Sequence, residues 1–217
     1  MKSHIREPAN ALTHLFGTVF AVAGSVILIW KSAIAGKSWQ VISFAIFGAG
    51  LILLYTASTL YHWLPLKSRG VARLRKLDHM MIFVLIAATY TPVCLIPLRG
   101  PWGWSLLAAV WAIALGGIFL VFFAMDTPRW FSTLIYVLMG WLAVSAIWPL
   151  IQALSLAALL WILIGGLFYT IGAIIYACKK PDPWPGQFGF HAIFHIFVLL
   201  GSFSHYWLMY RYILPMS

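Results

Sequence analysis

Charged residues are scarce in this chain, and acidic residues are the scarcest. Only 8% of its 217 residues are charged and only four are Asp or Glu, whereas 63% are hydrophobic. A soluble domain is about a quarter charged, because its surface must be mostly polar. The scarcity therefore excludes a soluble globule and predicts an integral membrane protein.

Cysteine is nearly absent as well. The chain has two cysteines, Cys94 and Cys178, and no Cys-x-x-Cys pair, which excludes a thiolate metal site. We expect these two cysteines near opposite ends of their helices, roughly a bilayer core of 30 Å apart. A disulfide between them is therefore excluded by distance.

The apolar runs are about 20 residues long and show no alternation of polar and apolar positions, which favours α-helices over strands. We expect one membrane domain over residues 1–217 with seven transmembrane helices. The expected spans are 11–30, 41–62, 78–97, 104–124, 130–148, 154–177 and 189–210. The fifth boundary is the least marked, because Pro149 is as compatible with a kink as with a helix end.

The first span is expected to stay in the mature protein. Ala21-Val22-Ala23 resembles a signal-peptidase site, but the apolar run continues past it to Trp30, too long for a signal-peptide core.

Basic residues divide unequally between the two sides of this topology. If the N-terminus is cytoplasmic, ten lysines and arginines lie on that side and four on the other, which predicts an N-terminus inside and a C-terminus outside. The ten are Lys2, Arg6, Lys67, Arg69, Arg73, Arg75, Lys76, Arg129, Lys179 and Lys180; the four are Lys31, Lys37, Arg99 and Arg211. The net charge of +10 follows mainly from this asymmetry, and no soluble basic face remains for nucleic acid. The five-cation loop before the third span is either a topology signal or a contact for anionic lipid head groups.

Two histidines, His191 and His195, are four residues apart on the seventh span. A helix turns about 100° and rises 1.5 Å per residue, so the two rings project from one face about 6 Å apart along the axis. Two imidazoles so placed can share one metal ion, although hydrogen bonding between helices or a proton relay remains an alternative.

The topology brings other polar side chains to the same depth. The second span ends at Ser58 and His62, and the third begins at Asp78, all within about two turns of the cytoplasmic face. His205 lies about 15 Å further along the seventh helix than His195 and cannot join the same site.

Three neutral imidazoles, from His62, His191 and His195, with one water would form the arrangement of a catalytic zinc site. Asp78 could then orient that water or take its proton, and Ser58 could donate a hydrogen bond to a polarised carbonyl. Two simpler interpretations stay open: Asp78 could cap the third helix, and His62 could be an interfacial anchor. His79 is expected to be a packing or interfacial residue, while the roles of Glu7, Asn10 and His14 stay open.

The chain resembles a known family over nearly its whole length. The matching motifs are Glu7-x-x-Asn10-x-x-x-His14-x-x-Gly17, Ser58-x-x-Tyr61-His62, Asp78-His79, Tyr90-Thr91-Pro92, His191-x-x-x-His195 and Gly201-Ser202-x-x-His205. Their order and spacing resemble the bacterial hemolysin III branch of the progestin and adipoQ receptor family.

The resemblance implies a multi-pass protein of the bacterial plasma membrane with a Zn²⁺ ion near the cytoplasmic face. The family's zinc ligands fall on His62, His191 and His195, its water-associated acid on Asp78 and its conserved serine on Ser58. The wider superfamily includes alkaline ceramidases, which suggests hydrolysis of a lipid amide.

Several functions are compatible with these residues. The first is a zinc-dependent intramembrane hydrolase of a lipid amide or ester, in which a zinc-activated water attacks, Asp78 acts as base and Ser58 assists. The second is a sensor of membrane composition that binds lipid as a ligand and uses zinc only as a brace. A pore-forming cytolysin ranks lowest, because no amphipathic segment or export signal is evident, and clustering of the ionisable residues at one face argues against a proton-coupled transporter.

Overall fold

The structure, a computed structural model, describes residues 5–124 and 128–216; Lys2 and Asp126 therefore lie outside the described residues. Within these ranges the chain is helical, and seven helical stretches are long and apolar enough to cross a membrane. The elements are α1 (Pro8–Ile34), α2 (Ser38–Trp63), α3 (Ser68–Leu95), α4 (Pro101–Phe123), α5 (Arg129–Gly140), η1 (Trp141–Ala146), α6 (Ile147–Ala153), α7 (Leu156–Cys178), α8 (Phe190–Leu208) and η2 (Met209–Ile213). The stretch α5–η1–α6 forms one span and α8–η2 another, so the predicted seven-helix, all-α membrane fold is confirmed.

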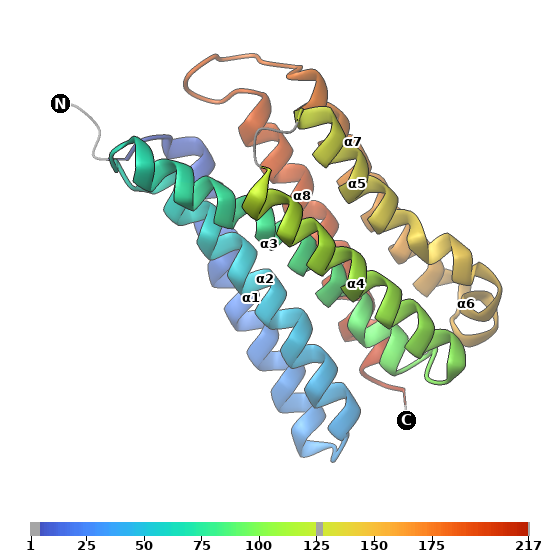
Figure 1. The fold of residues 1–217 in the computed structure, drawn as a ribbon. Coiled ribbons are helices and arrows are strands. Elements are labelled where there is room, and N and C mark those ends of the chain that lie inside the picture. The colour runs from blue at the N-terminus through green and yellow to red at the C-terminus, as the bar shows by residue number, and fades with distance from the viewer. Residues whose placement is uncertain (1–4, 125–127, 217) are drawn as a thin grey trace.

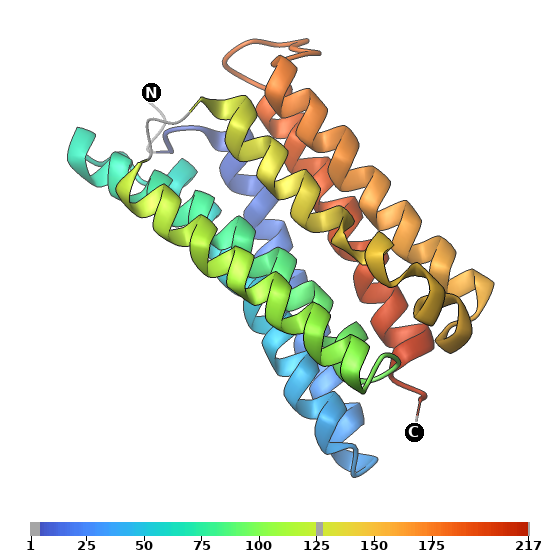
Figure 2. The ribbon, with the colours of Figure 1, turned by 45° about the vertical axis from the view of Figure 1, so that its right-hand side comes forward.

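Helices that are consecutive in sequence pack side by side as hairpins. The first four follow one another across one part of the bundle, and α7 pairs with α8 in the other, as Figure 1 shows. Contacts of α1 with α8, and of α5 with α3 and α7, join the two parts. Both views place the start of α1 and the loop between α7 and α8 at the same end of the bundle (Figure 2), which we call the amino-terminal end.

Helix α3 begins at Ser68, ten residues before Asp78. Asp78 therefore lies inside the helix, and its interpretation as the N-cap is wrong. The first turns of α3 carry four cations, which lower hydropathy, yet Arg, Lys and Leu are all good helix formers. Hydropathy marks where the apolar part of this helix starts, whereas the helix itself begins earlier.

The fifth span is irregular. Pro149 lies inside α6 and does not end the span, which continues to Ala153. Proline lacks an N–H and its ring clashes with the carbonyl four residues earlier, so it disturbs the helix on its N-terminal side. The 3-10 stretch η1 is found on that side, so Pro149 accompanies a distortion within a continuous span.

Helix α1 is packed closely between α2 and α8. A Cβ added at Gly17 would come within 2.8 Å of both Tyr55 on α2 and Leu199 on α8, so only glycine allows this approach. The Tyr55 hydroxyl also donates a 2.6 Å hydrogen bond to Ser202 Oγ on α8. This packing holds α2 and α8 on either side of α1 and fixes the relative position of the histidines they carry.

Candidate metal centre

The three histidines predicted to bind metal come together at the amino-terminal end of the bundle. One ligand nitrogen from each of His62, His191 and His195 lies within 4.8 Å of the other two. The ring centroid of His62 is 4.9 Å from that of His191 and 5.1 Å from that of His195. His62 and His195 are each 1% exposed, and His191 is half-buried. The cluster, defined by these three residues, could hold one metal ion, and the burial of His62 does not fit an interfacial anchor.

Hydrogen bonds fix the tautomers of the two buried rings. His62 Nδ1 lies 2.5 Å from Glu7 Oε2, and His195 Nδ1 lies 3.2 Å from the Asn10 carbonyl oxygen. Because carboxylate and carbonyl oxygens only accept, each Nδ1 carries the hydrogen and donates it. Each Nε2 therefore keeps its lone pair, and His62 Nε2 is buried with no partner among the described residues. Imidazoles oriented in this way by a carboxylate or carbonyl are typical metal ligands, so the cluster fits the implied zinc ion.

Glu7 is held in place by the segment that precedes α1. Its backbone N–H donates to the His62 carbonyl at 3.0 Å, and its carboxylate accepts from Asn10 Nδ2 at 2.9 Å and pairs with Arg6 at 3.3 Å. Partial burial raises the pKa of Glu7, but the hydrogen bonds from His62 and Asn10 and the charges of His62 and Arg6 outweigh it and lower the pKa to about 2. Glu7 is therefore ionised at neutral pH and positions His62.

Replacement of Glu7 tests this positioning role. We expect Glu7→Gln to weaken metal binding roughly 10- to 100-fold while all three ligands remain, because the charged partner of His62 Nδ1 is lost. Metal affinity would be measured by competition with a chelator. Ser32→Ala, which changes a buried polar residue at the far end of α1, should leave the affinity unchanged. Wild-type affinity in Glu7→Gln would contradict the assignment.

Asp78 and Ser58 lie beside the cluster on neighbouring helices. Asp78 is 9% exposed on α3, and Ser58 is fully buried on α2, one turn before His62. The Asp78 carboxyl interacts electrostatically with His62 and is within reach of the Ser58 hydroxyl. Ser58 Oγ makes no hydrogen bond of standard geometry in the described part of the chain. Their catalytic roles remain predictions.

His14 is a neighbour of the cluster that the sequence left unassigned. Its ring stacks on that of His195, with centroids 3.5 Å apart and planes 10° apart. The nitrogen lone pairs of an imidazole lie in the plane of its ring. Because the His14 and His195 rings are stacked, their lone pairs lie in parallel planes and do not converge on one ion. Thr13 also reaches the cluster, with Oγ1 3.1 Å from His195 Nδ1. The spacing Glu7-x-x-Asn10-x-x-x-His14 is that of residues on one helical face. It is the sequence signal for the residues that surround the cluster.

The other candidate residues lie outside the cluster. His205 stacks on Tyr169 with centroids 5.7 Å apart, further along α8. The Tyr136 hydroxyl donates to the His79 carbonyl at 3.2 Å, and the His79 ring belongs to none of the metal-binding groups found in the described ranges. Both cysteines are free, as expected.

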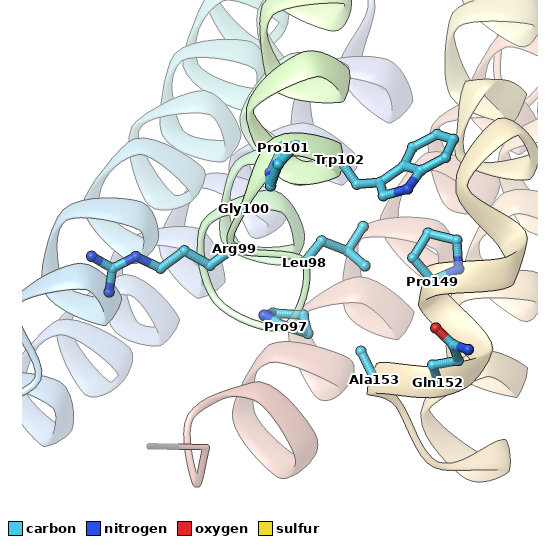
Figure 3. Close-up of a pocket in the computed structure, with 9 residues that line it drawn as sticks. All are labelled: Pro97, Leu98, Arg99, Gly100, Pro101, Trp102, Pro149, Gln152 and Ala153. Atoms are coloured by element: carbon cyan, nitrogen blue, oxygen red, sulfur yellow. The ribbon is translucent and has the colours of Figure 1, made fainter.

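A hollow lies away from the cluster, between α6 and the loop joining α3 to α4 (Figure 3). It has a volume of about 290 Å³. Leu98, Trp102 and Pro149 line it, and Arg99 extends away from it, with its guanidinium 4.2 Å from the centroid of the Trp39 ring. Its lining residues include no acid, histidine or cysteine. This hollow therefore offers no acid–base or metal-binding group of the kind found at the histidine cluster.

Comparisons with known proteins show which family the chain is similar to. A family model described as Haemolysin-III related matches residues 2–206. The chain is 42% identical over 197 residues to the Hemolysin-3 homolog of Bacillus subtilis (strain 168), covering 90% of this chain and 89% of that protein. It is 41% identical over 211 residues to Hemolysin-3 of Bacillus cereus, covering 96% and 92%. The human Monocyte to macrophage differentiation factor is 28% identical over 212 residues, covering 94% and 83%.

These matches, together with the seven apolar helices, make the chain a multi-pass membrane protein. They extend over the segments that carry Glu7, Ser58, Asp78, His191 and His195, and the resemblance drawn from the sequence motifs is confirmed. The chain belongs to the haemolysin-III related family.

Proposed function

We propose that this chain is a zinc-dependent intramembrane hydrolase that cleaves an amide or ester bond of a membrane lipid. The observation that carries the proposal is a buried carboxyl and a buried hydroxyl, Asp78 and Ser58, beside three converging imidazoles. A purely structural metal site needs its ligands and their hydrogen-bond partners. It has no need of an additional buried acid.

The residues suit hydrolysis as follows. When bound, a zinc ion supplies Lewis acidity, which acidifies water and polarises a carbonyl. Asp78 accepts a proton from the attacking water as the water oxygen bonds to the carbonyl carbon of the lipid. Ser58 donates a hydrogen bond to the carbonyl oxygen. The C–N or C–O bond then breaks, and Asp78 returns the proton to the leaving amine or alcohol. Fatty acid is one product.

Release of fatty acid tests this proposal. Purified full-length protein reconstituted in lipid nanodiscs would be supplied with ceramides, other acyl amides or phospholipids, and free fatty acid measured by mass spectrometry. We expect release from at least one pool, loss of release after chelation and recovery after zinc is added back. Metal-loaded protein that releases no fatty acid from any pool would overturn the proposal.

The packing of α1 favours one alternative, a lipid sensor braced by metal. α1 lies between α2 and α8, which are joined near their middle by the bond from Tyr55 to Ser202. A metal held by His62, His191 and His195 would join the same helices at the amino-terminal end, so lipid binding could be coupled to their arrangement. In that case loss of a ligand would alter stability, and loss of Asp78 would have little effect.

A further inference from the structure

A small pocket lies beside the histidine cluster but is lined by different residues. It has a volume of about 50 Å³ and lies between α3, α4, α5 and α7. Its lining includes Arg75, Arg129, Ser132, Thr133, Tyr136 and Tyr176. A water molecule occupies about 30 Å³ of liquid, so the pocket has the size of a small ion or a single polar group. It is too small for an acyl chain or a nucleotide.

The pocket is positively charged and none of its lining residues is acidic. Within residues 5–124 and 128–216, neither Arg75 nor Arg129 forms an ion pair. The Arg129 guanidinium lies 4.7 Å from the Tyr176 ring centroid, which fixes its position. Its Nη1 is buried and has no hydrogen-bond acceptor among the described residues. A buried guanidinium nitrogen without an acceptor is costly, so a ligand that supplies an acceptor would be stabilised at this position.

The start of α5 adds to the positive character of the pocket. α5 begins at Arg129, so the positive end of its dipole lies beside Ser132 and Thr133 of the pocket lining. Such helix starts attract anions. The Thr133 and Tyr136 hydroxyls already donate to the backbone carbonyls of Arg129 and His79. The two guanidinium groups beside a helix N-terminus are the donor set that suits a phosphate group.

We propose that this pocket binds a phosphate group, supplied either by a phospholipid head group or by free phosphate. Its place in the bundle favours the lipid, because Tyr176 lines the pocket and also contacts the His191 ring, with centroids 5.5 Å apart. Arg75 lies one turn before Asp78 on α3. A lipid held by its phosphate would place its glycerol and acyl region toward the histidine cluster. The phosphate site does not depend on whether that cluster hydrolyses lipid.

Binding of matched ligands tests the proposal. Full-length protein in dodecyl maltoside would be titrated with short-chain phosphatidic acid, with diacylglycerol of the same chains, and with inorganic phosphate. We expect phosphatidic acid to bind and diacylglycerol not to. Binding of inorganic phosphate with the same dependence on the arginines would support the site and assign it to free phosphate. No binding by either phosphate compound would overturn it.

Three charge-matched variants separate the pocket from general electrostatics. Arg75→Gln and Arg129→Gln should each weaken binding about tenfold or more, since each removes a charge-assisted hydrogen bond. Arg73→Gln removes the same charge from an exposed position on α3 outside the pocket and should change binding by less than about twofold. Equal loss in all three would show non-specific attraction and overturn the site. Because Arg129 also packs on Tyr176, thermal unfolding would show whether Arg129→Gln still folds. If it does not, the comparison of Arg75→Gln with Arg73→Gln decides, because Arg75 is exposed and its replacement should not disturb the fold.

Discussion

His62→Ala and His191→Ala should each lose the bound metal when purified, whereas His205→Ala should retain it. His62 and His191 contribute ligand nitrogens from two different helices, and their loss leaves two imidazoles. Loss of a ligand itself should cost more than the roughly 10- to 100-fold that loss of a hydrogen-bonding partner costs. His205 is a matched control, because it is another histidine of α8 that packs on Tyr169 and lies outside the cluster.

Elemental analysis of the purified proteins is the measurement, with zinc expected in wild type at about one equivalent per chain. Equal metal content in wild type, His62→Ala and His191→Ala would refute the cluster as the metal site. Thermal unfolding adds a second readout, because an ion bound only by the folded chain stabilises it. Added zinc should raise the Tm of wild type and His205→Ala and leave that of His62→Ala unchanged.

Much of this site was predictable because helix geometry leaves few choices. The spacing of His191 and His195 places them on one face, and antiparallel connections bring the end of α2 to the start of α8. The structure brings the rings of His62, His191 and His195 together as expected. His205 lies outside the cluster, as its distance along the helix predicted, and packs on Tyr169.

The surrounding residues could not be predicted in the same way. Glu7 reaches His62 because the segment before α1 pairs its backbone with the end of α2, through Arg6 to Trp63 and Glu7 to His62. Contacts between residues more than 50 positions apart, one of which lies outside the helices, leave no periodic signal in the sequence. The stacking of His14 on His195 is equally a consequence of how closely α1 packs, which depends on Gly17.

The start of α3 shows a different limit. Hydropathy measures the cost of transfer into lipid, and the cations of the first turns of α3 raise that cost without opposing the helix. The sequence therefore predicts a span that starts at Asp78, whereas the helix starts at Ser68. The difference matters for function. A capping aspartate would be committed to backbone N–H groups, but Asp78 inside the helix has its carboxyl available to face His62 and Ser58.

Asp78→Asn should strongly slow fatty-acid release while leaving metal content and fold intact. Asparagine has nearly the same shape and can still accept a hydrogen bond from Ser58, but it cannot take a proton from water. General acid–base catalysis contributes about 10²- to 10⁴-fold, so the rate should fall by that factor. Asp182→Asn is the matched control, because Asp182 lies in the loop between α7 and α8 and its Oδ1 accepts from Phe190 N, which an amide oxygen can also do.

The rate of release and the metal content must be measured on the same preparations. A low rate with full metal content in Asp78→Asn, beside a normal rate in Asp182→Asn, would assign proton transfer to Asp78. Full activity in Asp78→Asn would rule out its role as the base. If no preparation releases fatty acid but His191→Ala lowers both metal content and Tm, the metal acts as a brace between α2 and α8. The buried carboxyl of Asp78 thus separates the two functions that the histidine cluster alone leaves open, because only hydrolysis requires it to accept a proton.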